Sequence, residues 1–148
     1  MAGILFDGRS TPAVLVSNTA QTLLQIQAPA NQRVIVRNIR ASGLDASGSA
    51  NLPVRYRITR STSNFGTSST ATPSKRNPSD AEAIQSTCKQ TFTVEPTSPT
   101  EDGAIYISPQ LAFGEQGQWE IPGGQSLQVE ALCPSGTPTV ECWITAEE

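Results

Sequence analysis

Apolar and polar residues alternate along most of the chain, which is the pattern of half-buried β-strands. The clearest example is residues 54–60, where Val54, Tyr56 and Ile58 share one face and the intervening arginines share the other. We expect this strand to bury its apolar face and to expose its arginines.

Residues 33–40 form a second strand rich in β-branched side chains, but here the alternation is less regular, which predicts a β-bulge near Asn38. Because this strand and the one at 54–60 follow each other in sequence, we expect them to be neighbours in one sheet. Their basic side chains would then form one patch, made of Arg33, Arg37, Arg40, Arg55, Arg57 and Arg60.

The same patterning predicts nine short strands separated by turns rich in Gly, Pro and Ser. They are residues 13–16, 22–28, 33–40, 54–60, 87–94, 104–108, 118–121, 126–133 and 139–145. In the strand at 87–94, Phe92 and Val94 are expected to face inward. No segment predicts a helix longer than one turn. The fold expected is all-β, a single-domain β-sandwich or jelly roll of about eight or nine antiparallel strands covering residues 13–148.

The last two strands are predicted to pair as a hairpin, with Val140 opposite Ala131. In that register Cys133 and Cys142 are too far apart for a disulfide. The chain has three cysteines, an odd number that does not suit a disulfide framework, so we expect buried free thiols and synthesis in a reducing cytoplasm.

Two segments lie outside this regular pattern. Residues 1–12 are expected to form an arm carrying Ile4, Leu5 and Phe6, which would pack either on its own domain, the favoured choice, or on a neighbouring molecule. If it binds a neighbour, deleting residues 1–9 should weaken assembly without unfolding the domain. Residues 61–82 form a long loop rich in hydroxyl side chains, interpreted as a contact loop or as disorder without a role, with one helical turn predicted at 79–82.

Charge is distributed unevenly along the chain. Residues 1–60 carry seven arginines against two acidic side chains, whereas residues 61–148 carry three basic against eleven acidic side chains. Such an asymmetry favours ordered contact within the protein or docking on a charged surface. The alternative is that both sets lie on solvated faces and only keep the protein soluble.

The residue types that usually carry chemistry are scarce. There is no histidine, and the cysteines and carboxylates lack the spacing of a metal site, so we assign no catalytic, cofactor-binding or metal-binding residue and expect no enzyme. Aromatic residues make up only 5% of the chain, which argues against nucleic-acid binding. Trp119 and Trp143 remain candidate platforms for a sugar. No apolar run is long enough to span a membrane as a helix.

The layout of the chain resembles that of the small jelly-roll decoration, or cement, proteins of tailed-bacteriophage heads. The resemblance lies in the short arm, the consecutive strands at 33–40 and 53–60, the loop Thr72-Pro-Ser-Lys75, and the turn Ile121-Pro-Gly-Gly-Gln-Ser-Leu127 that leads into a strand. It implies a homotrimer on the outside of the virion capsid that bridges subunits of the major capsid protein. A carbohydrate-binding module or a tail or fibre β-sandwich is the alternative.

On this hypothesis the apolar arm anchors on a neighbour, and basic side chains meet an acidic surface. The residues proposed to bind a partner are Ile4, Leu5, Phe6, Arg33, Arg37, Arg40, Arg55, Arg57, Lys75 and Arg76.

Overall fold

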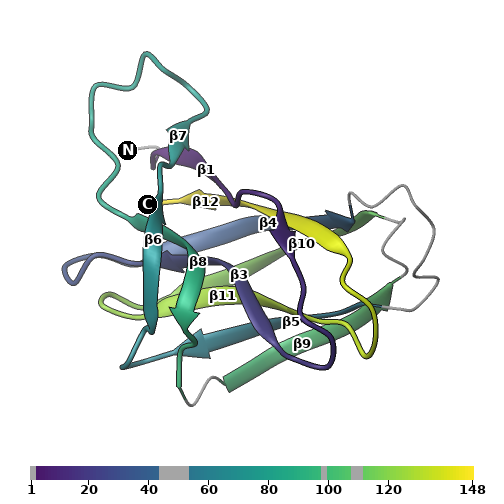
Figure 1. The fold of residues 1–148 in the computed structure, drawn as a ribbon. Helices are drawn as coiled ribbons and strands as arrows, with labels where there is room; N and C mark the ends of the chain where they lie inside the picture. Colours follow the sequence, from purple (N-terminus) through teal and green to yellow (C-terminus); the bar gives the residue numbers. More distant parts are fainter. Residues whose placement is uncertain (1–2, 44–53, 98–99, 108–111) are drawn as a thin grey trace.

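The computed structural model describes residues 3–43, 54–97, 100–107 and 112–148. Within these residues the chain forms twelve β-strands and no helix, arranged as two six-stranded antiparallel sheets that pack together (Figure 1). The all-β sandwich predicted from the sequence is confirmed. The described part of the chain contains no helix that is long and apolar enough to cross a membrane.

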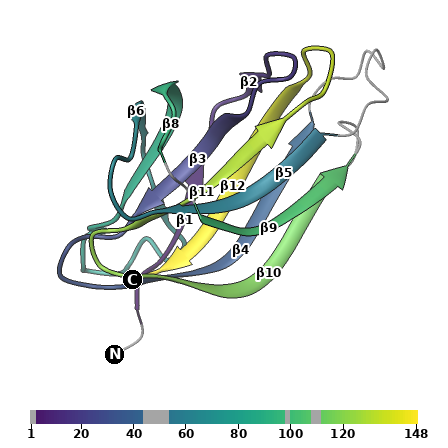
Figure 2. The same ribbon diagram turned by 90° about the horizontal axis from the view of Figure 1, so that it is seen from below.

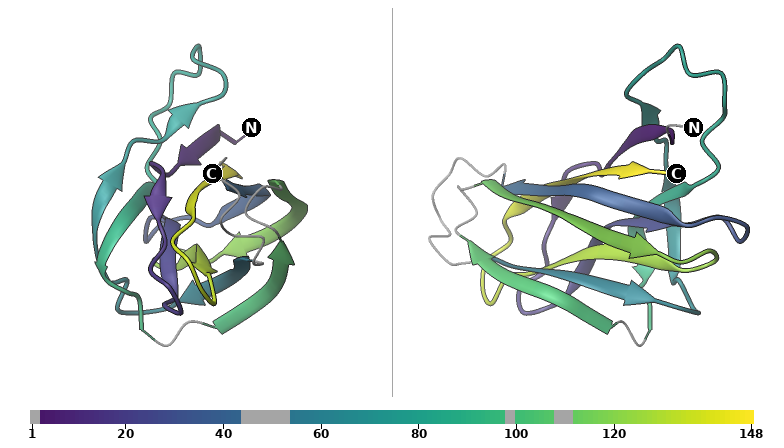
Figure 3. Two further views of the ribbon diagram at one scale, coloured as in Figure 1. Left: turned by 45° about the vertical axis from the view of Figure 1, so that its right-hand side comes forward. Right: turned by 180° about the vertical axis from the view of Figure 1, so that it is seen from behind.

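The first sheet, sheet A, has six strands. In spatial order they are β10 (Ala112–Ile121), β4 (Val34–Gly43), β12 (Thr139–Glu147), β1 (Leu5–Arg9) and β7 (Ser74–Lys75), with β2 (Ala13–Val14) also paired to β12. Sheet B contains β6 (Thr67–Ala71), β8 (Thr87–Val94), β3 (Gln21–Gln27), β11 (Ser126–Leu132), β5 (Val54–Ser61) and β9 (Thr100–Ile107). Figure 3 shows the two layers from two further directions.

Strand pairs in this sandwich are nested along the sequence. Strand β1 pairs with β12, β3 with β11, β4 with β10, and β5 with β9. Members of successive pairs alternate between sheets, so the chain crosses from one sheet to the other between β3 and β4 and again between β4 and β5. Neighbours in sequence are therefore mostly not neighbours in a sheet.

The predicted faces of the central strands are correct. In β5, Val54, Tyr56 and Ile58 are buried, and the arginines between them are half-buried on the other face. In the pairing of β4 with β12, Asn38 opposes Thr145 and Val36 opposes Ala146, so the register skips Arg37. This irregularity confirms the bulge predicted near Asn38.

The predicted hairpin at the end of the chain is wrong. Strand β11 lies in sheet B between β3 and β5, whereas β12 lies in sheet A between β4 and β1. The loop between them crosses the sandwich, and both strands turn their apolar faces toward the shared core. The apolar pattern is the same in either arrangement, so it cannot distinguish them. Cys88, Cys133 and Cys142 are buried free thiols, as predicted.

Strand β8 also departs from the predicted alternation. Its first half follows the prediction, because Cys88 is fully buried, but Phe92 is only half-buried and Val94 is 53% exposed. Thr91 adopts a left-handed backbone conformation with φ of 51°, which interrupts the two-residue period of the strand. The end of the strand therefore turns its apolar side chain to solvent.

The segment predicted as a loop is partly ordered. It contains β6, which pairs with β8, and β7, which pairs with β1. The stretch joining β7 to β8 stands off the sandwich near the C-terminus (Figures 1 and 3). A turn forms in place of the expected helical one, since the amide N–H of Asp80 donates to the carbonyl of Asn77 over 3.2 Å. Together with β1, β6 and β7 account for the strands beyond the nine expected.

Candidate binding surfaces

The predicted single arginine patch does not form. Strand β4, which carries Arg37 and Arg40, lies in sheet A, and strand β5, which carries Arg55 and Arg57, lies in sheet B. The prediction assumed that consecutive strands are neighbours, but the nested pairing separates them onto opposite sheets. Arg33 and Arg60 still meet, because Arg33 donates to the carboxylate of Glu120 and Arg60 donates to its backbone carbonyl oxygen.

On the outer face of sheet A, arginines pair with carboxylates of the same chain. Arg37 donates from Nε and Nη2 to Oε2 of Glu147, over 3.0 and 2.7 Å. Arg9 contacts Glu141 at 3.2 Å and places its guanidinium 4.9 Å from the ring centroid of Trp143. These strands thus carry alternating charges that compensate one another.

A third ion pair on this face joins β1 to the segment after β7. Arg76 lies 3.0 Å from Asp7, and Asp7 also accepts a hydrogen bond of 2.6 Å from the hydroxyl of Thr145. The neighbouring Lys75 donates to the carbonyl oxygen of Asp80 over 2.7 Å. Both basic residues, predicted to meet a partner, hold this segment onto its own domain.

Sheet B also contains an arginine that is paired with a carboxylate of the same chain. Arg57 pairs with Glu130, whose side chain is only 7% exposed, and the two residues oppose each other in the register of β5 and β11. A cavity of about 70 Å³ beside them is lined in part by Arg55. At the end of the sandwich, Arg33 lies 3.5 Å from Glu120, and both side chains are more than half exposed. Of the two roles proposed for the charge asymmetry, contact within the protein is the one the structure shows.

The apolar triplet near the start of the chain belongs to the domain. Phe6 is fully buried in the core and Ile4 is 5% exposed, whereas Leu5 is half-buried. The favoured prediction of own-domain packing is confirmed, and the hypothesis that the triplet anchors on a neighbour is wrong for Ile4 and Phe6. An arm distinct from the domain is not seen, because β1 is a strand of sheet A between β12 and β7.

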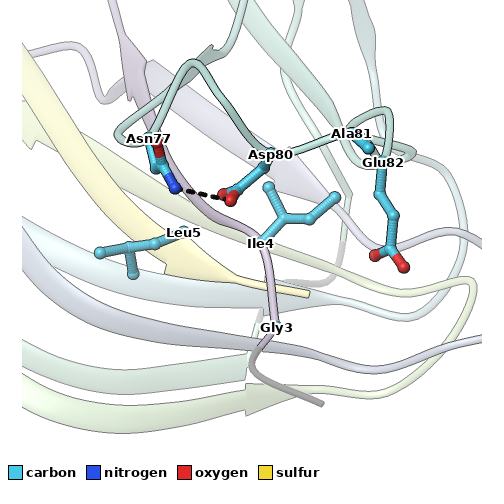
Figure 4. A pocket seen from close by; sticks show the side chains of 7 residues that line it. All are labelled: Gly3, Ile4, Leu5, Asn77, Asp80, Ala81 and Glu82. Carbon is cyan, nitrogen blue, oxygen red and sulfur yellow. Dashed lines mark hydrogen bonds between the residues drawn. The ribbon is translucent and has the colours of Figure 1, made fainter.

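Close to this triplet is an open pocket of about 390 Å³ (Figure 4). Ile4 points toward Asp80 in it, and Asn77 donates to the Asp80 carboxylate over 2.7 Å. This bond lies within the segment after β7. The pocket forms where that segment arches over the start of β1.

Both tryptophan side chains are only partly exposed. Trp119 packs against the core, and a Cβ added at Gly117 would lie 2.9 Å from its ring. Trp143 lies on the outer face of β12, on the opposite side from Cys142 and Ile144, and the guanidinium of Arg9 lies over its ring. Arg9 therefore occupies one face of the Trp143 ring, and the Trp119 ring is partly buried against the core.

A shallow groove of about 370 Å³ crosses the outer face of sheet A. Residues from four strands and from the segment after β7 line it, among them Leu5, Arg37, Asn38, Arg76, Gln116 and Thr145. Its two arginines are each paired with a carboxylate, so the groove is close to neutral while presenting many hydrogen-bond donors and acceptors. The sequence offered no signal for it, because its residues come from distant segments.

Large exposed apolar side chains occur on the segment before β3 and at the end of β8. Among the described side chains, the large hydrophobic ones that remain exposed are Val14, Val16 and Val94, at 60%, 56% and 53%. A cavity of about 280 Å³ is lined by Val14, Phe92 and Glu95, among others. Sequence reasoning missed this feature, because alternation placed Val94 inside.

Among the residues that the structure describes, few features indicate a metal site or a reactive thiol. No group of three or more Cys, Asp or Glu side chains there is placed to hold a metal ion. Burial, together with the nearby charge of Glu148, raises the pKa of the Cys88 thiol to about 12, and burial alone raises that of Cys142. Both thiols are consequently protonated at neutral pH and are poor nucleophiles.

Comparison with known proteins adds no functional information. No protein-family model matches the chain, and no curated protein matches its sequence.

Proposed function

We propose that this chain is a structural virion protein, a small jelly roll that binds the outside of a bacteriophage capsid as an oligomer and bridges subunits of the major capsid protein. The observation that carries the proposal is the nested pairing of β1 with β12, β3 with β11, β4 with β10 and β5 with β9 across two sheets. We interpret this order as a jelly roll, an architecture common in viral capsid proteins and in lectins.

Fold alone does not assign a function, so the surface must support it. Two features do. Several arginines of the outer faces are paired with carboxylates of the same chain, which suits a rigid body that docks by shape. Val14, Val16 and Val94 are exposed, and Val14 lines a cavity beside β3 and β8, where an exposed apolar side chain suits a protein contact.

An oligomer, proposed as a homotrimer, would strengthen weak contacts with the capsid. Once one subunit has bound, the others bind at a high effective concentration, so avidity rises without a new type of contact. Because Ile4 and Phe6 are buried, the proposal no longer relies on an apolar arm. Contacts with the capsid would come from surface side chains such as Leu5, Arg33 and Arg40.

The test is a stabilisation assay with expanded heads of the parent phage that lack this protein. Adding the purified chain should raise the temperature at which filled heads release DNA, and the chain should sediment with the heads. A matched sample of heat-denatured chain is the control. Failure to sediment with the heads, at protein concentrations well above that of capsid subunits, would exclude the proposal.

Carbohydrate binding is the second candidate, and the groove on sheet A favours it. A neutral groove with closely spaced amide, guanidinium and hydroxyl groups matches the hydroxyls of a sugar, which both donate and accept hydrogen bonds. Retention on a glycan array that is lost in Gln116→Ala, with the fold intact, would support this function. Retention lost only on changing Trp143 would instead indicate the stacking role suggested by the sequence.

A further inference from the structure

The part of sheet B beside Val14 contains an unpaired stretch of strand. Pairing between β3 and β8 covers Leu24 to Gln27, and β3 begins three residues earlier, at Gln21. Beyond the left-handed residue Thr91, β8 diverges from β3 toward the end where β2 lies (Figure 2). The cavity of about 280 Å³ occupies this divergence, and we call it the edge slot.

Side chains occupy hydrogen-bonding positions around the edge slot that a neighbouring strand would normally fill. The amide N–H of Thr22 donates to Oε2 of Glu95 over 2.9 Å. The amide of Thr11, which lies outside the strands but also lines the slot, donates to Oε1 of Gln90 over 2.7 Å. Backbone donors at strand edges are satisfied by a partner strand or by such substitutes. The edge of β3 at Thr22 is therefore closed by a side chain that a partner strand could replace.

We propose that the edge slot receives an extended segment of a partner protein, in which a lysine or arginine lies beside Glu95 and apolar residues cover Val14 and Phe92. The partner's backbone carbonyl would replace the Glu95 carboxylate on the Thr22 amide, which adds a short strand alongside β3. The displaced carboxylate would then pair with the partner's cation. This inference does not depend on the capsid role.

The chemistry of the occupant follows from the lining of the slot. Glu95 is half-buried, and the charge of Glu130 adds to its negative potential. A basic residue is the complementary choice, and an acidic one would be repelled. Val14, which is 60% exposed, and the half-buried Phe92 also line the slot and favour apolar neighbours for that basic residue.

A second copy of this chain fits less well. The strands at the edges of the two sheets are β6, β7, β9 and β10. Strand β6 has no charged residue, and β9 and β10 carry only acidic ones. Strand β7 contains Lys75, but that side chain is held by the carbonyl oxygen of Asp80. A different protein is accordingly the expected partner.

The test uses the acetylated and amidated peptide Val-Thr-Lys-Thr-Val, with the full chain labelled for amide NMR. We expect the largest shifts at the amides of Thr22, Val14 and Phe92. Two control peptides carry Glu in place of Lys, or an N-methyl group on the central amide. The Glu peptide should bind at least about threefold more weakly, and the methylated one should not bind.

Variants sharpen the result. Glu95→Gln should remove the preference for Lys over Glu. Val14→Asn, which removes an apolar contact without adding charge, should weaken the Lys peptide, while Thr72→Asn, on an exposed loop, should not. The proposal is overturned by an absence of shifts at millimolar peptide, by equal binding of the Lys and Glu peptides, or by binding of the methylated one. A concentration-dependent dimer that Val14→Asn abolishes would also overturn it, because the slot would then hold a second copy.

Discussion

Phe6 determines how the beginning of the chain is held. Its side chain has no exposed area, and it lies in the same core cluster as Leu24, Ile144 and Cys88. Leu5, one residue earlier, points the other way and is half-buried. At the scale of single residues, the strand therefore has one side that stabilises the core and one side available to solvent or a partner.

Replacing Phe6 with Ala should lower the free energy of unfolding by about 3–5 kcal/mol, because a large buried side chain leaves a cavity. The matched variant Leu5→Ala should cost about 1 kcal/mol, since its side chain is only partly removed from water. Urea denaturation followed by tryptophan fluorescence would measure both. Similar small losses in the two variants would show that Phe6 is not part of the core.

Glu95 provides a pH-dependent prediction. Partial burial raises the pKa of its carboxyl above the ordinary value of 4.5, and the negative charge of Glu130 raises this pKa further. The hydrogen bonds from Thr22 lower the pKa, but their effect is smaller than that of burial. A raised pKa means that the folded state holds the proton more tightly than the unfolded state. The contribution of Glu95 to the free energy of unfolding is therefore largest below pH 4.5, and it decreases as the pH rises through the raised pKa of the folded state.

Glu95→Gln keeps an acceptor for the Thr22 amide but does not titrate. The free energy of unfolding of the native chain, minus that of Glu95→Gln, should therefore fall as the pH rises through the raised pKa and then level off. Chemical denaturation at a series of pH values would measure this difference. A difference that stays constant, or that grows with pH, would contradict the assignment.

At the scale of elements, β1 is an integral strand. It pairs with β12 over five residues and with β7 on its other side. A Cβ added at Gly8 would lie 2.8 Å from the sulfur of Cys88, which shows how closely the strand approaches sheet B. Its sequence suggested a detachable arm because only three apolar residues precede a turn-like stretch, and length alone does not reveal pairing.

Deleting residues 1–9 should therefore unfold the domain or greatly lower its melting temperature, which reverses the expectation for a detachable arm. Adding a synthetic peptide of residues 1–9 should restore part of the stability by re-forming the pairing with β12. Circular dichroism during heating would follow both effects. A truncated chain that melts at the same temperature as the full chain would refute the structural role of β1.

The break in β8 depends on Thr91, a β-branched residue with positive φ. This conformation is costly for such a residue, and glycine adopts it without steric strain. Thr91→Gly should stabilise the protein by roughly 0.5–1 kcal/mol, whereas Thr93→Gly on the same strand should destabilise it by a similar amount. Urea denaturation would compare them. Destabilisation by Thr91→Gly would argue against strain at this position.

For the whole molecule, the sequence predicts the strands better than their partners. The faces of β5, the bulge in β4 and the buried thiols follow from local patterns, which the sequence displays directly. Local patterns do not predict which sheet a strand joins, because β11 and β12 show the same apolar faces whether they form a hairpin or lie in opposite sheets. The arginine patch failed for that reason, and the edge slot was missed because it depends on one backbone angle at Thr91.

The central claim is that this sandwich acts as an oligomeric part of a phage head. Light scattering after size-exclusion chromatography tests it most directly, first on the isolated chain and then on expanded empty heads mixed with an excess of it. The account predicts an isolated particle of three times the 15.7 kDa chain mass and heads that gain mass until their sites are filled. A monomer that leaves the mass of the heads unchanged would contradict it.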